Sequence, residues 1–363
     1  PLPLVAKRYS VTSGTLRLIP TLYLAESELV AGLNIDQRNP QALLLLKDKK
    51  KLKPSSLSLI KNLPNNIIIL DVNSDLGIEN QAKELKALRV IYSTYDEIQS
   101  DPIAKKELSD QIDHRQTSIT TTLKKLVDPS FSSWYWKGKK LKIKSNVEAQ
   151  VQLSKILESI YAKSSVIKNE LVNRDQVSSQ GQSARIKLMK DMLNNREMHY
   201  LGYPKDKFPP EKTIFNAIFV VNDLYKFKQN YGKFEEPAKG ANLFPIYAHL
   251  KKLLSNASEP VSFQTIQESL SAIPFGLKKG LQPLIFLGFY LANENNLAVY
   301  EDGIFRPYIN NESIDRLVRK TEAFSFQMHA FEEQQSIISQ YADSLFGDNS
   351  KEMNILNIVK KLS

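Results

Sequence analysis

The sequence predicts an α/β protein whose second half is mainly helical. Two short apolar runs, residues 42–46 and 67–70, show no polar alternation, which is typical of strands buried on both faces of a parallel sheet. Segments with helical periodicity separate and follow these runs. Further along, apolar helical segments precede a hairpin signal at Asp302-Gly303. We therefore expect a small parallel-sheet α/β unit, a helical middle region, a winged-helix-like domain and C-terminal helices.

Changes in pattern along the chain predict four parts. Residues 1–100 form the α/β domain, and residues 101–240 form a helical region that contains a tryptophan hairpin. Residues 241–325 form the winged-helix-like domain, and residues 326–363 form C-terminal helices. The polar segment 232–240 contains Pro237 and is the expected linker of the second half.

The α/β domain is expected to begin with a strand in residues 15–24, where apolar side chains alternate. A short helix follows near Ser27, and residues 55–63 predict a helix between the two apolar runs. Residues 80–88 then predict another helix, and residues 90–92 predict another strand.

A long helix opens at Asp101-Pro102 and extends to about Leu126. Aspartate is a favoured N-cap, and proline is tolerated in the first turn. We expect this helix to link domains.

Residues 134–144 predict a hairpin that turns near Lys137-Gly138 and contains both tryptophans of the protein. Aromatic residues interleaved with lysines can bind single-stranded nucleic acid through base stacking and phosphate contacts. A more common role for two tryptophans beside a glycine turn is a docking edge for neighbouring helices, and both interpretations stay open. Together with a second basic turn, the candidate nucleic-acid contacts are Trp134, Trp136, Lys139, Lys140, Lys142, Lys144, Lys278 and Lys279.

The segment 167–192 carries polar residues at helical intervals among apolar ones. Asn169 and Asn173 are four residues apart, as are Glu170 and Arg174, so each pair would meet on neighbouring turns of a helix. A serine pair at 178–179 can cap a second helix, from which Arg185 is free to reach outward. We predict a helical hairpin with an internal Glu170–Arg174 ion pair. The predicted structural junction consists of Asn169, Glu170, Asn173, Arg174 and Arg185.

Residues 243–310 contain helical and strand segments in the order of a winged helix. In winged helices that read DNA, the third helix presents polar side chains to the major groove. Here that helix, residues 281–292, is apolar nearly all round and suits burial. Protein docking is therefore favoured over direct base reading. Amphipathic helices are expected at residues 312–320 and 331–346, and another at 354–362.

The residue types that carry chemistry are sparse. The chain has no cysteine, which excludes disulfides and thiolate zinc sites, and it has no Gly-x-x-x-x-Gly-Lys-Ser/Thr phosphate cradle. Its four histidines are isolated from one another. Asp71 with Glu84 and Lys86 approximates a metal-dependent nuclease pattern, but the helical context of the latter two disfavours it. We predict no catalytic residue, no metal ligand and no cofactor in this chain.

Charge and hydropathy restrict the location and the partners. The formal net charge is +10, which permits nucleic acid without demonstrating it. No apolar run approaches the roughly 20 residues that cross a bilayer, so we expect no membrane span. The absence of cysteine fits a cytoplasmic origin.

Several distinct motifs are distributed along most of the chain. They are Thr15–Pro20, Asn169–Arg174, Ser178-Ser179, Ala184-Arg185, Leu188, Pro210-Glu211-Lys212, Pro274–Gly280, Leu297–Gly303, and Phe305 with Pro307. With these motifs the sequence resembles the region downstream of the ATPase module in large bacterial P-loop ATPases of phage-defence islands, of which BREX BrxC/PglY-like proteins are the nearest group. The chain differs from these full-length ATPases in lacking a P-loop motif.

The resemblance implies a noncatalytic region that mediates assembly or effector coupling in antiviral defence. Its partners would be an upstream ATPase domain, which would bind ATP and Mg²⁺, and other proteins of the defence system; self-association is also compatible with it. The alternative is a nucleic-acid-binding module, for DNA or RNA, of the same system. If the resemblance holds, the chain is a piece of a longer protein.

Overall fold

A computed structural model describes residues 3–25, 36, 38–46, 54–73 and 76–328. The chain forms two compact units. Unit 1 comprises Pro1–Tyr9 and Leu16–Ile160, and unit 2 comprises Ser10–Thr15 and Tyr161–Ser363. Residue 100, the expected end of the α/β domain, lies inside unit 1.

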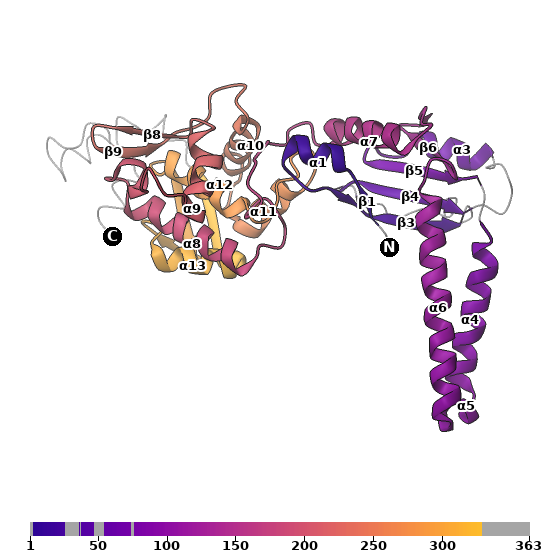
Figure 1. The fold of residues 1–363 in the computed structure, drawn as a ribbon. Coiled ribbons are helices and arrows are strands. Elements are labelled where there is room, and N and C mark those ends of the chain that lie inside the picture. Colours follow the sequence, from indigo (N-terminus) through magenta and orange to yellow (C-terminus); the bar gives the residue numbers. More distant parts are fainter. Residues whose placement is uncertain (1–2, 26–35, 37, 47–53, 74–75, 329–363) are drawn as a thin grey trace. The chain divides into compact units, whose positions relative to one another are not determined.

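Unit 1 is built on a five-stranded mixed sheet with the order β3-β4-β5-β6-β7 (Figure 1). β3 (Thr21–Ala25), β4 (Gln41–Leu46) and β5 (Ile67–Val72) run parallel. β5 is buried along its whole length, as is the centre of β4, which confirms the prediction of parallel strands buried on both faces.

The tryptophan hairpin extends this sheet. β6 (Ser132–Trp136) pairs antiparallel with β5, and β7 (Lys139–Lys140) pairs with β6 at the sheet edge. The hairpin predicted at Lys137-Gly138 is confirmed, but it joins the parallel strands and not a separate helical region. The sequence pattern did not reveal this pairing because nearly 60 residues separate β5 from β6.

Helices cover both faces of the sheet. On one face Ile60 of α3 (Pro54–Lys61) packs with Leu43, Leu45 and Ile69. Side chains alternate along a strand, so Trp134 lies on the opposite face, where it shares a hollow with Leu153 of α7 (Asn146–Ile160). The remaining elements at the start of the chain are β1 (Leu4–Val5), α1 (Lys7–Ser13) and β2 (Leu18–Ile19).

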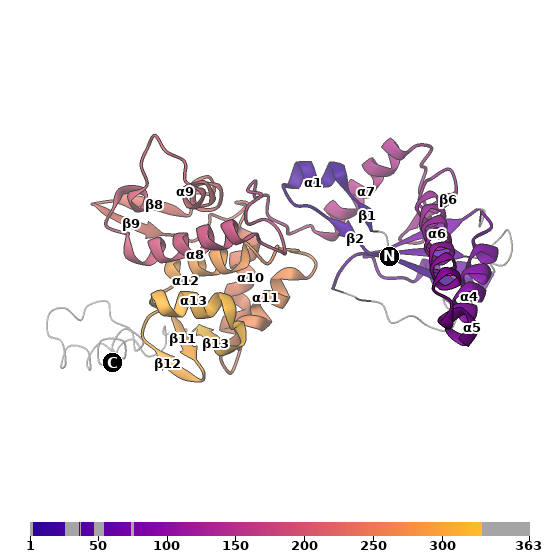
Figure 2. The same cartoon turned by 60° about the horizontal axis from the view of Figure 1, so that its bottom comes forward.

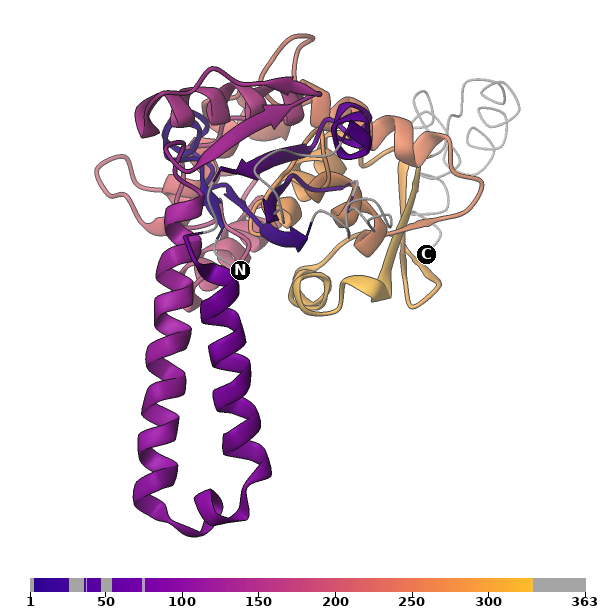
Figure 3. The ribbon, with the colours of Figure 1, turned by 90° about the vertical axis from the view of Figure 1, so that its right-hand side faces the viewer.

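A long antiparallel helical hairpin extends from the sheet of unit 1 (Figures 1 and 3). It consists of α4 (Ile78–Thr94), the short α5 (Asp96–Ser100) and α6 (Pro102–Leu126). The strand predicted at residues 90–92 is wrong, because these residues continue α4, whose helical pairing with α6 outweighs their β propensity. The expectation that α6 links domains is also wrong, since α6 returns the chain to β6 of the same unit.

The N-terminus of α6 is formed as its sequence predicts. An oxygen of the Asp101 carboxyl accepts hydrogen bonds from the backbone N–H of Ile103 at 2.9 Å and of Ala104 at 3.3 Å. Pro102 occupies the first turn, where no backbone donor is required.

Unit 2 is mainly helical. Its longer helices are α8 (Ser179–Asn194), α9 (Pro210–Phe215), α10 (Phe244–Ser255), α11 (Phe263–Ser271), α12 (Gln282–Ala292) and α13 (Asn311–Arg319). Short 3₁₀ helices occupy His199–Gly202 and Thr321–Ala323, and a π-helical turn occupies Asn216–Val220. Its strands are β8 (Tyr225–Lys228), β9 (Tyr231–Phe234), β10 (Val261–Ser262), β11 (Leu297–Glu301), β12 (Ile304–Arg306) and β13 (Phe324–Met328).

The core of unit 2 surrounds α12, which contacts α8 (Figure 2). Every residue from Gln282 to Leu291 is buried, which confirms the burial predicted from its apolar circumference. Gly288 allows Phe219 to approach, because a Cβ at that position would lie 2.5 Å from the Phe219 ring.

A four-stranded antiparallel sheet with the order β10-β13-β11-β12 completes unit 2. The hairpin predicted at Asp302-Gly303 is confirmed, with positive φ at both residues. The central strand β13 was missed, because residues from 326 onward were assigned to helices. Its Phe326 ring lies 4.5 Å from the ring of Phe286 in α12, so packing against α12 selects the extended form.

The segment predicted as a linker, residues 232–240, is partly a strand. β9 pairs with β8, and Gly232 and Phe234 are buried. Residues 231–234 form a strand because exposed and buried positions alternate along them. The helices expected at residues 331–346 and 354–362 lie outside the described residues. Within the ranges that the structure describes, no helix combines the length and apolar character needed to span a bilayer.

Replacement of the Asp101 cap should weaken the first turn of α6, at the tip of the helical hairpin. We expect Asp101→Ala to lower the free energy of unfolding by about 1 kcal/mol, because two backbone donors lose their acceptor. Asp101→Asn should have a much smaller effect, since asparagine caps equally well. Chemical denaturation of both variants measures the difference, and equal stabilities would contradict the cap.

Candidate functional site

The segment at residues 167–178, chosen from the sequence as a junction, is a loop and not a helix. The predicted helical hairpin is therefore wrong, although the second helix begins at Ser179 with Ser178 as its N-cap. Glu170 and Arg174 are both exposed, and among the described ion pairs none joins them. The predicted internal pair is absent because the loop does not place these residues on neighbouring helical turns.

The loop is held by the side chain of Asn173, which is buried. Its Nδ2 donates to the backbone oxygens of Ile167 at 2.7 Å and Gly14 at 2.8 Å, and to Thr15 Oγ1 at 3.0 Å. The Nδ2 atom carries only two hydrogens, so three acceptors share them. Asn169 has a local role, since its Oδ1 accepts from the backbone N–H of Leu171 at 3.1 Å.

Two glycines allow the rest of unit 2 to approach this loop closely. A Cβ on Gly181 of α8 would lie 2.7 Å from the Leu171 oxygen, and a Cβ on Gly280 would lie 2.1 Å from the Val172 oxygen. The backbone N–H of Gly280 donates to the Arg174 oxygen at 3.0 Å. Any side chain at either glycine would displace the loop backbone.

Arg185 is buried against the same turn. It is 5% exposed, and its Nη1 donates to the Gly280 oxygen at 3.3 Å. The prediction that it reaches outward is wrong, because α8 directs it into the contact with Gly280. Burial lowers the pKa of the Arg185 guanidinium, and within the described residues no carboxylate forms an ion pair with it.

The second basic turn is partly neutralised. Lys278 Nζ lies 2.5 Å from Asp175 Oδ2, and Asp175 Oδ1 accepts from the backbone N–H of Lys279 at 3.3 Å. Lys278 is thereby used to fix the loop, whereas the side chain of Lys279 is exposed. Of the two lysines predicted here as nucleic-acid contacts, Lys278 is partly buried in an ion pair, whereas Lys279 is exposed and forms no ion pair with any residue that the structure describes.

The motif Pro210-Glu211-Lys212 is also used inside unit 2. Buried Glu211 forms an ion pair with Lys187 of α8. The Lys212 ammonium donates to three backbone oxygens of one loop, at Pro204, Lys205 and Lys207. These contacts tie α9 to α8 and to the preceding loop, which is a structural role.

Asp71 and the segment that contains Glu84 and Lys86 do not form a nuclease centre. Asp71 is buried within β5, opposite Ser133 of β6. Glu84 lies on α4 and pairs with Arg115 of α6 at 2.6 Å. In the described part of the chain, no group of three histidine, aspartate or glutamate residues could hold a metal ion.

One histidine contacts a serine, but this contact does not activate the serine as a nucleophile. His249 Nε2 lies 3.1 Å from Ser269 Oγ. The Ser269 hydroxyl donates to the Ile266 oxygen at 2.8 Å, which uses its proton. Burial lowers the pKa of His249, with Lys163 and Lys252 adding to the effect.

The tryptophan hairpin separates into a buried and an accessible part. Trp134 is buried, and its Nε1 donates to Ser132 Oγ at 3.2 Å, so it cannot stack on a base. Trp136 is partly exposed, and its Nε1 donates to the Asn65 oxygen at 2.7 Å. The predicted contacts that remain exposed on this hairpin are Lys139, Lys140, Lys142 and Lys144.

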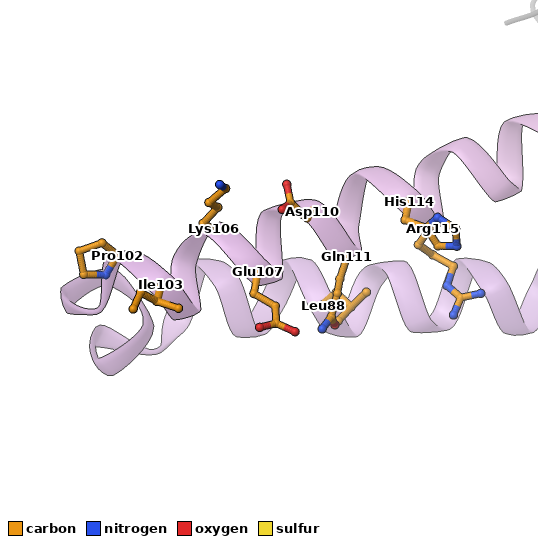
Figure 4. Close-up of a pocket in the computed structure, with 9 residues that line it drawn as sticks. All are labelled: Leu88, Pro102, Ile103, Lys106, Glu107, Asp110, Gln111, His114 and Arg115. Atoms are coloured by element: carbon orange, nitrogen blue, oxygen red, sulfur yellow. The ribbon is translucent and has the colours of Figure 1, made fainter.

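A groove on the helical hairpin was not predicted from the sequence. It has a volume of about 860 Å³, and eight of its nine lining residues come from α6 (Figure 4). They are Leu88 of α4 together with Pro102, Ile103, Lys106, Glu107, Asp110, Gln111, His114 and Arg115. The sequence signal that could have indicated it is the helical spacing of three to four residues from Ile103 through Glu107 and Asp110 to His114.

The hairpin buries little of its own surface. Ile78 is the one buried residue of α4, and Leu126 is that of α6. Much of the contact between the helices is polar, including Ser118 Oγ to Gln81 Oε1 at 3.2 Å. Several apolar side chains on the outer surface are exposed; they are Val90 at 50%, Ile91 at 38%, Tyr95 at 53% and Ile103 at 79%.

Comparison with family models, with curated proteins and with solved structures finds no match to this chain.

Replacement of Asn173 by the isosteric aspartate tests whether its side chain holds the loop at residues 167–178 in place. We expect Asn173→Asp to lower the free energy of unfolding by about 3 kcal/mol or more at pH 7, because the donors are lost and a carboxyl faces buried oxygens. That carboxyl should have a raised pKa when folded, so the deficit grows as pH rises above about 4, the unfolded value. Thermal denaturation across pH measures it.

The matched control for this change is Asn169→Asp in the same loop. Its carboxylate keeps the acceptor for the Leu171 N–H, so we expect a change within about 0.5 kcal/mol. Equal destabilisation by the two substitutions would contradict the role given to Asn173.

Proposed function

We propose that this chain is a noncatalytic assembly and effector-coupling region of a bacterial antiphage-defence ATPase, and that it acts through protein–protein contacts. The resemblance of its motifs to the post-ATPase region of BREX BrxC/PglY-like proteins supports this proposal. In the parent protein, ATP and Mg²⁺ would bind at a P-loop outside this region.

The helical hairpin of α4 and α6 is the observation that carries the proposal. Two helices with one buried residue each gain little stability from their mutual contact. Exposed apolar side chains gathered on a projecting element are typical of an interaction surface. The hairpin therefore acts as a docking arm whose apolar residues are covered by a partner.

The groove favours a partner helix of defined chemistry. Ile103 and Leu88 supply apolar contacts, and an amphipathic helix can lay an apolar stripe into such a groove. Charges of both signs lie along the groove, from Lys106 and Arg115 to Glu107 and Asp110. The complementary helix carries an apolar stripe with mixed charges beside it.

We further infer that residues 241–325 form a winged-helix-like docking domain. The order α10, β10, α11, α12, β11 and β12 supports this interpretation. β13 adds a strand between β10 and β11, which departs from the simple pattern. Because α12 is buried, this domain would contact protein and would not insert α12 into a DNA groove.

Removal of apolar surface from the arm should reduce association with a partner and leave folding intact. We expect the double variant Val90→Ser, Ile103→Ser to weaken binding to the ATPase portion of the parent protein at least about tenfold, since exposed anchors contribute disproportionately to interfaces. Size-exclusion chromatography with light scattering, with and without nucleotide, measures complex formation.

The control variant is Val166→Ser, Val221→Ser, which removes similarly exposed apolar residues from unit 2 outside the winged-helix-like domain, at 45% and 79% exposure. It should bind like the wild type, and both variants should unfold within about 0.5 kcal/mol of it. No association in any nucleotide state, or equal loss in both variants, would count against the docking arm.

A further inference from the structure

A row of lysines follows the outer edge of the five-stranded sheet. We define the lysine edge as Lys61, Lys137, Lys139, Lys140, Lys142 and Lys144. All six are exposed, and Lys61 of α3 adjoins the hairpin turn, where a Cβ on Gly138 would lie 2.9 Å from the Lys61 Cα. No acidic residue occurs between Asp128 and Glu148, so the hairpin segment itself carries no opposing charge.

Three of these lysines are evenly spaced along the chain. Lys140, Lys142 and Lys144 are exposed, whereas Leu141 and Ile143 between them are partly buried. In extended chain, alternate residues point to the same side and are separated by about 7 Å. This interval is close to that between successive phosphates of an extended nucleic acid strand.

The charge of the lysine edge is not neutralised by the protein. Across the described residues, none of its six ammonium groups forms an ion pair, whereas Lys83 of the same unit pairs with Glu79 at 2.6 Å. Lys144 is near Glu148 only through its backbone N–H, which donates to the carboxylate at 2.8 Å.

Protection of the sheet edge does not account for the whole row. Lysines on an edge strand discourage pairing with another strand, which suffices for Lys139 and Lys140 of β7. Lys142 and Lys144 lie beyond the end of β7, where no ladder requires protection. Their continuation of the same alternation indicates a ligand that follows the chain.

One aromatic ring accompanies the row. Trp136 pairs in register with Lys139, and its ring is oriented by the hydrogen bond from Nε1 to the Asn65 oxygen. The Lys137 ammonium lies over the ring, 4.3 Å from its centroid, so a base stacked on that face would take the place of this lysine. A partly exposed ring at the end of a basic row is the arrangement that holds a base by stacking and phosphates by charge.

We propose that the lysine edge binds the backbone of an extended single-stranded nucleic acid, with Trp136 as a stacking platform. Binding is independent of base sequence, because lysine contacts phosphate and stacking accepts every base. This activity is separate from the docking arm and does not depend on it.

Fluorescence anisotropy with a labelled oligothymidylate of about 20 nucleotides tests the proposal, at a length that spans the edge. The test variant replaces Lys139, Lys140, Lys142 and Lys144 by Gln. The control replaces four exposed unit 2 lysines by Gln, at Lys168, Lys205, Lys239 and Lys252. Each variant lowers the formal net charge from +10 by four, to +6, so a difference between them reports position and not total charge.

We expect the test variant to bind at least about tenfold more weakly in low salt, and its slope of log K against log salt to fall by about 3, since each phosphate contact on a single strand contributes about 0.7. The control should retain the wild-type slope. Intrinsic fluorescence gives a local signal, because both tryptophans lie in β6. Binding should change that fluorescence in the wild type and not in the test variant.

Three outcomes would overturn the proposal. They are no binding by the wild type in low salt, equal weakening in both variants, and a duplex bound as tightly as the single strand. If the fourfold variant fails to fold, the double variant Lys142→Gln, Lys144→Gln replaces it, because this change leaves β7 unaltered. The double variant must still reduce the slope of log K against log salt by about 1.4.

Discussion

Three acceptors from two distant stretches of chain converge on the side-chain amide of Asn173. They tie residues 14–15 to the loop at 167–178, and Gly181 and Gly280 then admit α8 and the start of α12 against the loop backbone. The buried core around α12 can close only when this loop has the correct path. Loss of the hydrogen bonds from this buried donor has a high free-energy cost, so the contact constrains all of unit 2.

Polar residues that the sequence singled out in this half of the chain are therefore occupied within unit 2. Arg185 donates to Gly280, Lys278 pairs with Asp175, and Glu211 pairs with Lys187. The two surfaces to which we assign binding, the apolar residues of the helical hairpin and the lysine edge, both lie on unit 1. We infer a division in which unit 1 supplies the docking arm and the lysine edge, and unit 2 supplies a packed body that contains the winged-helix-like docking domain.

Local patterns in the sequence predicted those elements whose conformation is decided locally. The apolar runs of β4 and β5, the Asp101 cap and the burial of α12 were predictable for this reason. The incorrect predictions concern segments whose conformation is decided by tertiary contacts. Residues 90–92 are helical because α6 lies beside α4, and Asn173 leaves helical spacing to reach Gly14. Phe326 is extended because it packs on Phe286. The hairpin groove depends on pairing between α4 and α6, which no single segment reveals.

Hydrogen exchange of the intact chain, followed by mass spectrometry, tests most directly whether the loop at 167–178 is a clamp. Backbone N–H groups in it have specific acceptors, such as Asn173 N–H to the Asn169 oxygen at 2.9 Å. If the loop closes unit 2, its hydrogen-bonded amides exchange only when unit 2 unfolds, at the rate of α8 and α12. Exchange of these amides at the rate of a surface loop, while α8 and α12 remain protected, would contradict the central role of Asn173.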